Sequence, residues 1–330
     1  MKKTMTQISL LLFCCIIGYS HNSVKAQDTT INNLVHTSGY KTSEYGAISQ
    51  YVKTGKGKQT LILIPGLGFD VSVFKDFMDA NKNNFTMYAI TIPGFGKTQA
   101  PPMPPSGTSY GEQTWNKGVV DGLVKLIDKE NLNKPIIVGH FVQGVQLAVM
   151  MAVDYPNKVG GLILMGGPAK FVAVMNGKIV DYPKDKMIMA ADKYTGPKWF
   201  MHMEKKDFDT GNFLPEIYSL DSTTANSLWE QSASVDLPVA IRYSCEYFAS
   251  DVRADFDKIK CPVLVLRSMF NNNVLDATIN IYLKPQFIDI WNDASARNPL
   301  IKVHDIADAA SFVWKDKPIE TYSAIREFLK

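Results

Sequence analysis

The stretch Pro135-Ile136-Ile137-Val138-Gly139-His140-Phe141-Val142-Gln143-Gly144-Val145-Gln146-Leu147-Ala148 decides the fold of this chain. Its first four residues suit a buried strand, and the segment from Val145 onward suits a helix. Gly139 and Gly144 flank the short turn between the two. Ligands of open α/β sheets bind at the carboxyl ends of strands. The turn residue Phe141 is therefore the first position to examine for function.

Apolar runs and helical patterns alternate on both sides of this stretch. Continuous apolar runs suit strands buried on both faces, and their alternation with helices predicts βαβ units in a mainly parallel sheet. The alternation stops over residues 170–250, which read as helices rich in Met and aromatic residues. We expect strands at 45–52, 60–64, 85–92, 135–138, 159–165, 261–266 and 300–306, and helices at 110–132, 145–154 and 318–329.

Four further short motifs occur in a characteristic order: Ile64-Pro65-Gly66-Leu67-Gly68, Pro93-Gly94-Phe95-Gly96-Lys97-Thr98, Asp154-Tyr155-Pro156-Asn157-Lys158-Val159 and the segment 251–262. With these motifs, residues 45–330 resemble the α/β-hydrolase superfamily, in its branch with a helical lid. The resemblance implies an α/β-hydrolase fold, with a mainly parallel central sheet flanked by helices and an inserted helical cap. The implied units are a first core part (27–169), a helical cap (170–250) and a second core part (251–330).

The resemblance also implies positions for a nucleophile, an acid and a histidine, in that chain order. In the elbow motif G-x-S-x-G, this chain has Phe141 for the serine and Gln143 for the second glycine. The acid position, after the strand ending at Leu266, falls at Asn271, and the histidine position falls at Ser311. A phenyl ring is no nucleophile, an amide carries no charge, and a hydroxyl is no base near neutral pH. The sequence therefore predicts that Ser-His-Asp hydrolysis is absent.

A bulky residue with positive φ is an outlier, so we expect the elbow to relax or Gly144 to take the tight position. Either change would displace the amide of Val142. In the family this amide and that of Leu67 would form the oxyanion hole.

The Met and aromatic side chains of the cap suit an adaptable apolar pocket. Our first interpretation is a non-catalytic, or catalytically reduced, protein that keeps a lidded apolar pocket and binds a small hydrophobic or acyl ligand there. Two alternatives stay open: an active hydrolase of small esters or lactones that uses non-standard residues, and a scaffold or interaction protein whose pocket is filled. The candidate pocket residues are Phe69, Phe141, Trp199, Phe200 and Trp229, and the candidate non-standard actors are His140, Ser268, Asp276 and Ser311.

The amino terminus has the pattern of a secretory signal peptide. Lys2 and Lys3 precede an apolar run of about ten residues, too short to span a bilayer, and a small-x-small signal ends at Ala26. We therefore expect cleavage after Ala26 and export to the periplasm or the medium. A lipid anchor on Cys14 or Cys15 is the weaker alternative.

Charge and metal-ligand patterns exclude several function classes. Removal of residues 1–26 takes away three lysines and no acid, so the formal charge falls from +3 to about zero. A neutral chain without a basic block does not have the charge pattern of a nucleic-acid-binding protein. No later run is long enough for a transmembrane segment, and no spacing indicates a metal or a dinucleotide cofactor. Cys245 and Cys261 remain in the mature chain, either paired or as two buried thiols. His202 and His304 read as structural or solvated residues.

Overall fold

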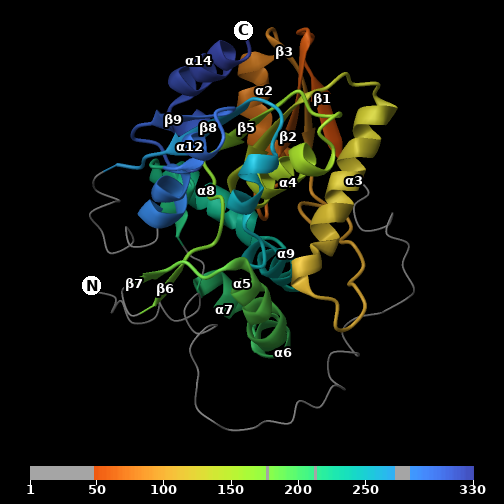
Figure 1. Cartoon of the computed structure of the whole chain (residues 1–330), viewed down its shortest axis with the longest axis vertical. Coiled ribbons are helices and arrows are strands. Elements are labelled where there is room, and N and C mark those ends of the chain that lie inside the picture. Colours follow the sequence, from red (N-terminus) through yellow and green to blue (C-terminus); the bar gives the residue numbers. More distant parts are fainter. Residues whose placement is uncertain (1–47, 176–177, 212–213, 272–282) are drawn as a thin grey trace.

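The computed structural model describes residues 48–175, 178–211, 214–271 and 283–330. Seven of its strands form one twisted sheet, in the order β1-β3-β2-β4-β5-β8-β9 (Figure 1). All neighbouring pairs are parallel except β1 with β3. The predicted signal peptide, Cys14, Cys15 and Asp276 lie outside the described residues. The strands are β1 (Tyr51–Thr54), β2 (Gln59–Ile64), β3 (Phe85–Ile90), β4 (Ile136–His140), β5 (Gly161–Met165), β8 (Val263–Ser268) and β9 (Ile301–Ile306).

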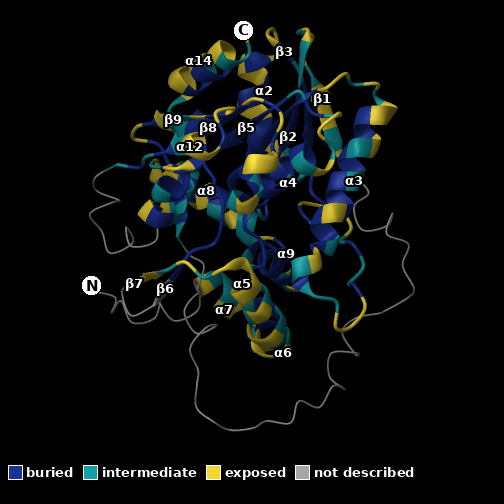
Figure 2. Cartoon of the chain, in the orientation of Figure 1, coloured by how far each residue is buried: buried dark blue, intermediate teal, exposed yellow. Residues whose placement is uncertain are grey.

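Alternate residues of the central strands face two separate hydrophobic cores, because successive side chains of a strand point to opposite faces. Ile62 and Ile64 of β2 face one core, with α3 (Thr114–Lys129) and α4 (Phe141–Asp154). Leu61 and Leu63 face the other core, with α2 (Lys75–Asn81) and α14 (Pro318–Phe328). Figure 2 shows the central strands buried and exposed residues on the outer sides of α3 and α14. These layers explain why the strands read as continuous apolar runs.

The cap is inserted between β5 and β8 and lies beyond the carboxyl ends of the parallel strands (Figure 1). It contains a two-stranded hairpin, β6 with β7, that the helical pattern did not predict. Its elements are β6 (Ala173–Met175), β7 (Lys178–Val180), α5 (Lys184–Ala190), a π-helical turn (Ala191–Thr195), α6 (Gly196–His202), α7 (Lys205–Gly211), a 3-10 turn (Pro215–Ile217), α8 (Ser222–Ala233) and α9 (Leu237–Phe248).

Short helical segments complete the core around the outer strands. They are 3-10 turns at Val71–Phe74, Tyr110–Glu112, Val252–Lys258 and Asp289–Trp291, a π-helical turn at Lys284–Ile288, α12 (Ala294–Arg297) and α13 (Val313–Asp316). Among the described residues, no helix has the length and apolar character needed to cross a membrane.

Candidate functional site

The turn at Phe141 keeps the strained geometry of a nucleophile elbow. Strand β4 ends at His140, α4 begins at Phe141, and Phe141 has φ +56° in the left-handed region. The expectation of a relaxed turn, or of Gly144 in the tight position, is therefore wrong. Gly144 instead allows close approach of the neighbouring strand, since a Cβ there would lie 2.5 Å from the carbonyl oxygen of Ile64. This conformation costs roughly 1–3 kcal/mol, and it occurs at the residue that the sequence predicts to stand at the family's serine position.

Gln143 replaces a glycine of the motif without opening the turn, because its side chain points into a buried polar cluster. Its amide nitrogen donates to Asn116 Oδ1, and more weakly to Gln146 Oε1 at 3.4 Å. The side chain is fully buried, and its own Oε1 has no hydrogen-bond partner. Thus the polar substitution at this position joins α4 to the start of α3.

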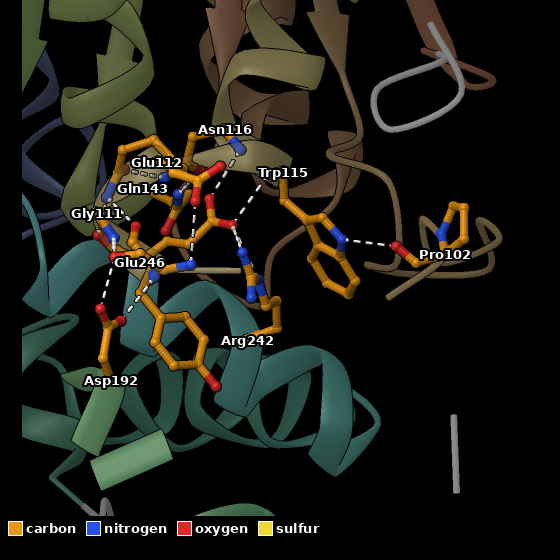
Figure 3. Close-up of polar contacts among 12 residues, drawn as sticks. Pro102, Gly111, Glu112, Trp115, Asn116, Gln143, Asp192, Arg242 and Glu246 are labelled. Atoms are coloured by element: carbon orange, nitrogen blue, oxygen red, sulfur yellow. Dashed lines mark hydrogen bonds and ion pairs between the residues drawn. The ribbon is translucent and has the colours of Figure 1, made fainter. Parts of the chain in front are cut away.

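Glu246 of cap helix α9 caps that same helix start (Figure 3). Its two carboxylate oxygens accept hydrogen bonds from the amides of Trp115 and Asn116, both at 3.0 Å, and Gln113, the residue before α3, supplies no side-chain cap. Arg242, one turn earlier on α9, donates to Glu246 Oε1 at 2.6 Å and 2.9 Å. Burial raises the pKa of Glu246, and Arg242 opposes this shift. A buried ion pair therefore fixes the cap to the core helices behind the elbow.

The ring of Phe141 is packed among other aromatic rings at the carboxyl edge of the sheet. Its centroid lies 5.6 Å from that of Tyr218, which belongs to the cap, and 6.1 Å from that of Phe287. Gly66 lies directly against it, since a Cβ there would be 2.6 Å from Cβ of Phe141. Only 7% of Phe141 is exposed. Aromatic side chains thus occupy the space beside the elbow, and no sequence motif had indicated Tyr218 or Phe287.

His140 is a buried neutral residue of this aromatic cluster. Its ring lies 4.2 Å from Phe312 and 4.7 Å from Trp314, centroid to centroid. Neither ring nitrogen has a hydrogen-bond partner of good geometry. Burial lowers the pKa of His140 to about 3, against an opposing contribution from the backbone of Ser311. The ring is therefore neutral near pH 7, and no side chain among the described residues is aligned with it for proton transfer.

Ser311 and Asn271 both follow carboxyl ends of strands, as their mapped positions require. The Ser311 hydroxyl is buried and donates to the carbonyl of Ile217 at 2.5 Å, so it is engaged with the cap. Asn271 is half-buried and follows Phe270, whose amide donates to the carbonyl of Ala309 at 3.0 Å. This bond sets the Asn271 loop beside the Ser311 loop. The triad assignment of the three positions remains a prediction.

The loop predicted to supply the oxyanion amide is covered by cap helix α8. The carbonyl of Leu67 accepts a hydrogen bond from Ser232 Oγ at 3.3 Å. Gly68 has φ +84°, and a Cβ there would lie 2.8 Å from the backbone of Ser232. Val142, the other predicted oxyanion residue, packs against two clusters. One is the hydrophobic core that contains Phe141, and the other is the cap cluster that contains Phe171. The helix and the loop are therefore in direct contact.

The five candidate pocket residues do not gather in one place. Phe69 joins the aromatic cluster of Phe141, with its ring 5.4 Å from that of Tyr218. Trp199 and Phe200 instead belong to the cap's own core, where the Trp199 ring lies 5.7 Å from that of Phe248. Trp229 on α8 is half-buried. The structure therefore brings Phe69 and Phe141 into one cluster and places Trp199 and Phe200 in another.

The other candidate actors have structural roles or lie elsewhere. Ser268 is buried and donates to the carbonyl of Ala310 at 2.9 Å. His202 and His304 are exposed, on α6 and β9. Cys245 and Cys261 are both buried, and they form no disulfide with each other. No group of His, Cys, Asp and Glu suited to a metal ion occurs among the described residues.

Comparisons with known proteins agree with this fold. No family model matches the chain. A 2-hydroxy-6-oxononadienedioate/2-hydroxy-6-oxononatrienedioate hydrolase of Paraburkholderia phymatum is 33% identical over 130 residues, which are 37% of this chain and 42% of that protein. The match thus spans less than half the length of this relative.

Two solved structures are similar over most of both chains. An esterase of Thermogutta terrifontis gives a TM-score of 0.60 at 19% identity, covering 85% of this chain and 92% of the esterase. An enol-lactonase of Burkholderia xenovorans gives 0.57 at 14% identity, covering 85% and 95%. The chain has the α/β-hydrolase fold. Sequence similarity to the hydrolase thus covers part of the chain, and structural similarity to the two enzymes covers most of it.

Proposed function

We propose that this protein is an exported member of the α/β-hydrolase superfamily that does not hydrolyse substrates with a Ser-His-Asp triad, and that it binds a small apolar or acyl molecule under its cap. One observation carries the loss of hydrolysis. Phe141 holds the elbow position with φ +56°, and a phenyl ring there has no atom that can attack a carbonyl.

The surroundings of Phe141 support the same proposal. Ser311 gives its hydroxyl hydrogen to a backbone carbonyl, and His140 is buried with a pKa of about 3. A general base needs a pKa near the working pH and a hydrogen bond to the proton that it removes. Neither residue satisfies both conditions, so a replacement pair of nucleophile and base is not assembled at the elbow among the described residues.

The proposed ligand class rests on the apolar lining and on the structural neighbours. The elbow is surrounded by Phe69, Tyr218 and Phe287, which offer apolar surface and few polar groups. The neighbours include an esterase and an enol-lactonase. Fatty acids, small esters and lactones are therefore the molecules to test.

A second candidate function is a scaffold or interaction protein with a permanently filled site. The close packing of Phe141 with Tyr218 and Phe287 favours it.

Two measurements on the chain from Gln27 to Lys330 test the proposal. Hydrolysis of p-nitrophenyl acetate and butyrate should not exceed that of an inactive protein of similar size. Melting temperature should rise with a fatty acid, a small ester or a lactone, because a ligand that binds only the folded state stabilises it. Turnover of the esters contradicts the loss of hydrolysis. If no compound raises the melting temperature and no ester is hydrolysed, the result favours the scaffold or interaction protein.

A further inference from the structure

A segment of the cap, Ile217–Leu220, is bound to the loop where the family's histidine would stand. The backbone amide and the hydroxyl of Ser311 both donate to the carbonyl of Ile217, at 2.9 Å and 2.5 Å. The amide of Phe312 donates to the carbonyl of Tyr218 at 3.0 Å. Thus the residue at the histidine position holds the cap rather than a substrate.

The Asp316 carboxylate is a second anchor of the same segment. It accepts hydrogen bonds from Ser219 Oγ at 2.6 Å and from the amide of Leu220 at 3.2 Å. It also accepts from the amide of Ala310 at 2.8 Å, which ties both sides of the junction to one carboxylate. None of these hydrogen bonds involves the side chain of Tyr218.

The Tyr218 ring extends from this anchored backbone across the elbow. Its centroid lies 5.6 Å from Phe141, 5.4 Å from Phe69 and 6.3 Å from Phe312. Its hydroxyl donates to Ser232 Oγ at 3.3 Å, and Ser232 donates in turn to the carbonyl of Leu67 at 3.3 Å. The ring therefore covers Phe141, and its one polar atom faces the loop where an oxyanion would be held.

We propose that Tyr218 is a built-in occupant of the apolar site, and that a ligand binds by displacing its ring from Phe141 and Phe69. This inference rests on the proposed function and adds how the site is occupied. Rotation of the side chain leaves the main-chain bonds to Ser311 and Phe312 intact. The ring contacts with Phe141 and Phe69 are lost and can be replaced by the ligand, and the side-chain hydrogen bond that is lost, to Ser232 at 3.3 Å, is a weak bond between two hydroxyls.

The geometry of the Tyr218 ring also indicates which ligand fits the site. The vacated space takes a flat ring or part of an acyl chain, and an oxygen of the ligand replaces the tyrosine hydroxyl at Ser232. The apparent affinity of the wild type equals the intrinsic affinity multiplied by the fraction of molecules in which the ring has moved away. A variant without the ring should therefore bind more tightly than the wild type, by at least about tenfold.

The test compares Tyr218→Ala with the wild type, using 4-methylphenol, which has the structure of the tyrosine side chain, and decanoate. Binding is measured by calorimetry and by melting temperature. Tyr194→Ala removes a tyrosine that is 50% exposed on the cap and is the matched control. Tyr218→Leu is the second variant if Tyr218→Ala does not fold. We expect 4-methylphenol to bind Tyr218→Ala at least tenfold more tightly than it binds either the wild type or Tyr194→Ala. We expect decanoate to bind the wild type and to gain affinity in the same variant.

The outcomes separate the inference from the function on which it rests. Equal affinity of decanoate for the wild type and Tyr218→Ala overturns the displacement and leaves ligand binding standing. Failure of 4-methylphenol to bind Tyr218→Ala or Tyr218→Leu overturns the occupancy itself. Binding of 4-methylphenol to the variant without binding of decanoate to any form overturns displacement and the proposed ligand class together, and favours a permanently filled site.

Discussion

Acid should destabilise this protein through His140, the residue immediately before the elbow. The unfolded chain binds a proton at this imidazole with a pKa of about 6.5. Burial among Phe312, Trp314 and other rings lowers the pKa in the folded state to about 3. The folded state therefore excludes a proton that the unfolded state accepts. Stability from this group is complete above about pH 6.5 and falls as the pH drops toward about 3.

The size of the effect follows from linkage. Each unit of pKa difference corresponds to about 1.4 kcal/mol, so lowering the pH from about 7 to about 5 should remove about 2 kcal/mol of unfolding free energy through His140 alone. His140→Leu removes the titrating ring and keeps an apolar side chain. This variant should lose about 2 kcal/mol less than the wild type over the same pH range.

Urea unfolding at several pH values between about 7 and about 5 measures this difference. His304→Leu is the matched control, because it makes the same substitution at a histidine that is exposed on β9. The reasoning is refuted if His140→Leu and the wild type lose the same stability on acidification. It is also refuted if NMR titration of the folded protein shows His140 protonating near its ordinary pKa.

Three further substitutions test the elbow and its support. Phe141→Ser alone should give no ester hydrolysis, because the described residues place no base to activate the new hydroxyl; turnover of p-nitrophenyl acetate well above the wild type would reveal a hidden base. Glu246→Ala should lower the unfolding free energy by about 3–5 kcal/mol in urea titrations, since it leaves the buried Arg242 without its partner, and a loss below about 1 kcal/mol would show that the pair is not structural. Gly144→Ala should cost about 1–3 kcal/mol by thermal unfolding, because its Cβ would meet the carbonyl of Ile64, and an unchanged melting temperature would disagree with the close approach.

The sheet could be predicted from the sequence because its strands are buried on both faces. Runs such as Thr60–Ile64 and the segment 261–266 are apolar at nearly every position, and the structure has β2 and β8 there. The elbow conformation could not be predicted from Phe141 itself, whose side chain disfavours positive φ. It depends on close approaches of the neighbouring chain at Gly66 and Gly144 and on packing of the ring, which are tertiary contacts.

Contacts within the cap also could not be predicted from the sequence. Its Met and aromatic content indicated apolar packing, but composition does not determine which face of a helix packs against which neighbour. Trp199 and Phe200 therefore pack in the cap's own core, whereas Tyr218, in a short 217–220 segment without periodicity, covers Phe141. The spacing of Arg242 and Glu246, one turn apart on a helix, is a sequence pattern that indicates an ion pair. Burial of the pair, and the capping of α3 by Glu246, depend on the fold.

Labelling with a fluorophosphonate, followed by intact-mass spectrometry, tests the central claim most directly. This reagent forms a covalent bond with a serine that is activated by a base. If Phe141 has ended Ser-His-Asp chemistry, the folded protein should show no adduct after prolonged incubation, while an active esterase of the same fold is labelled fully. A stoichiometric adduct that peptide mapping assigns to one serine, such as Ser268 or Ser311, would contradict the account.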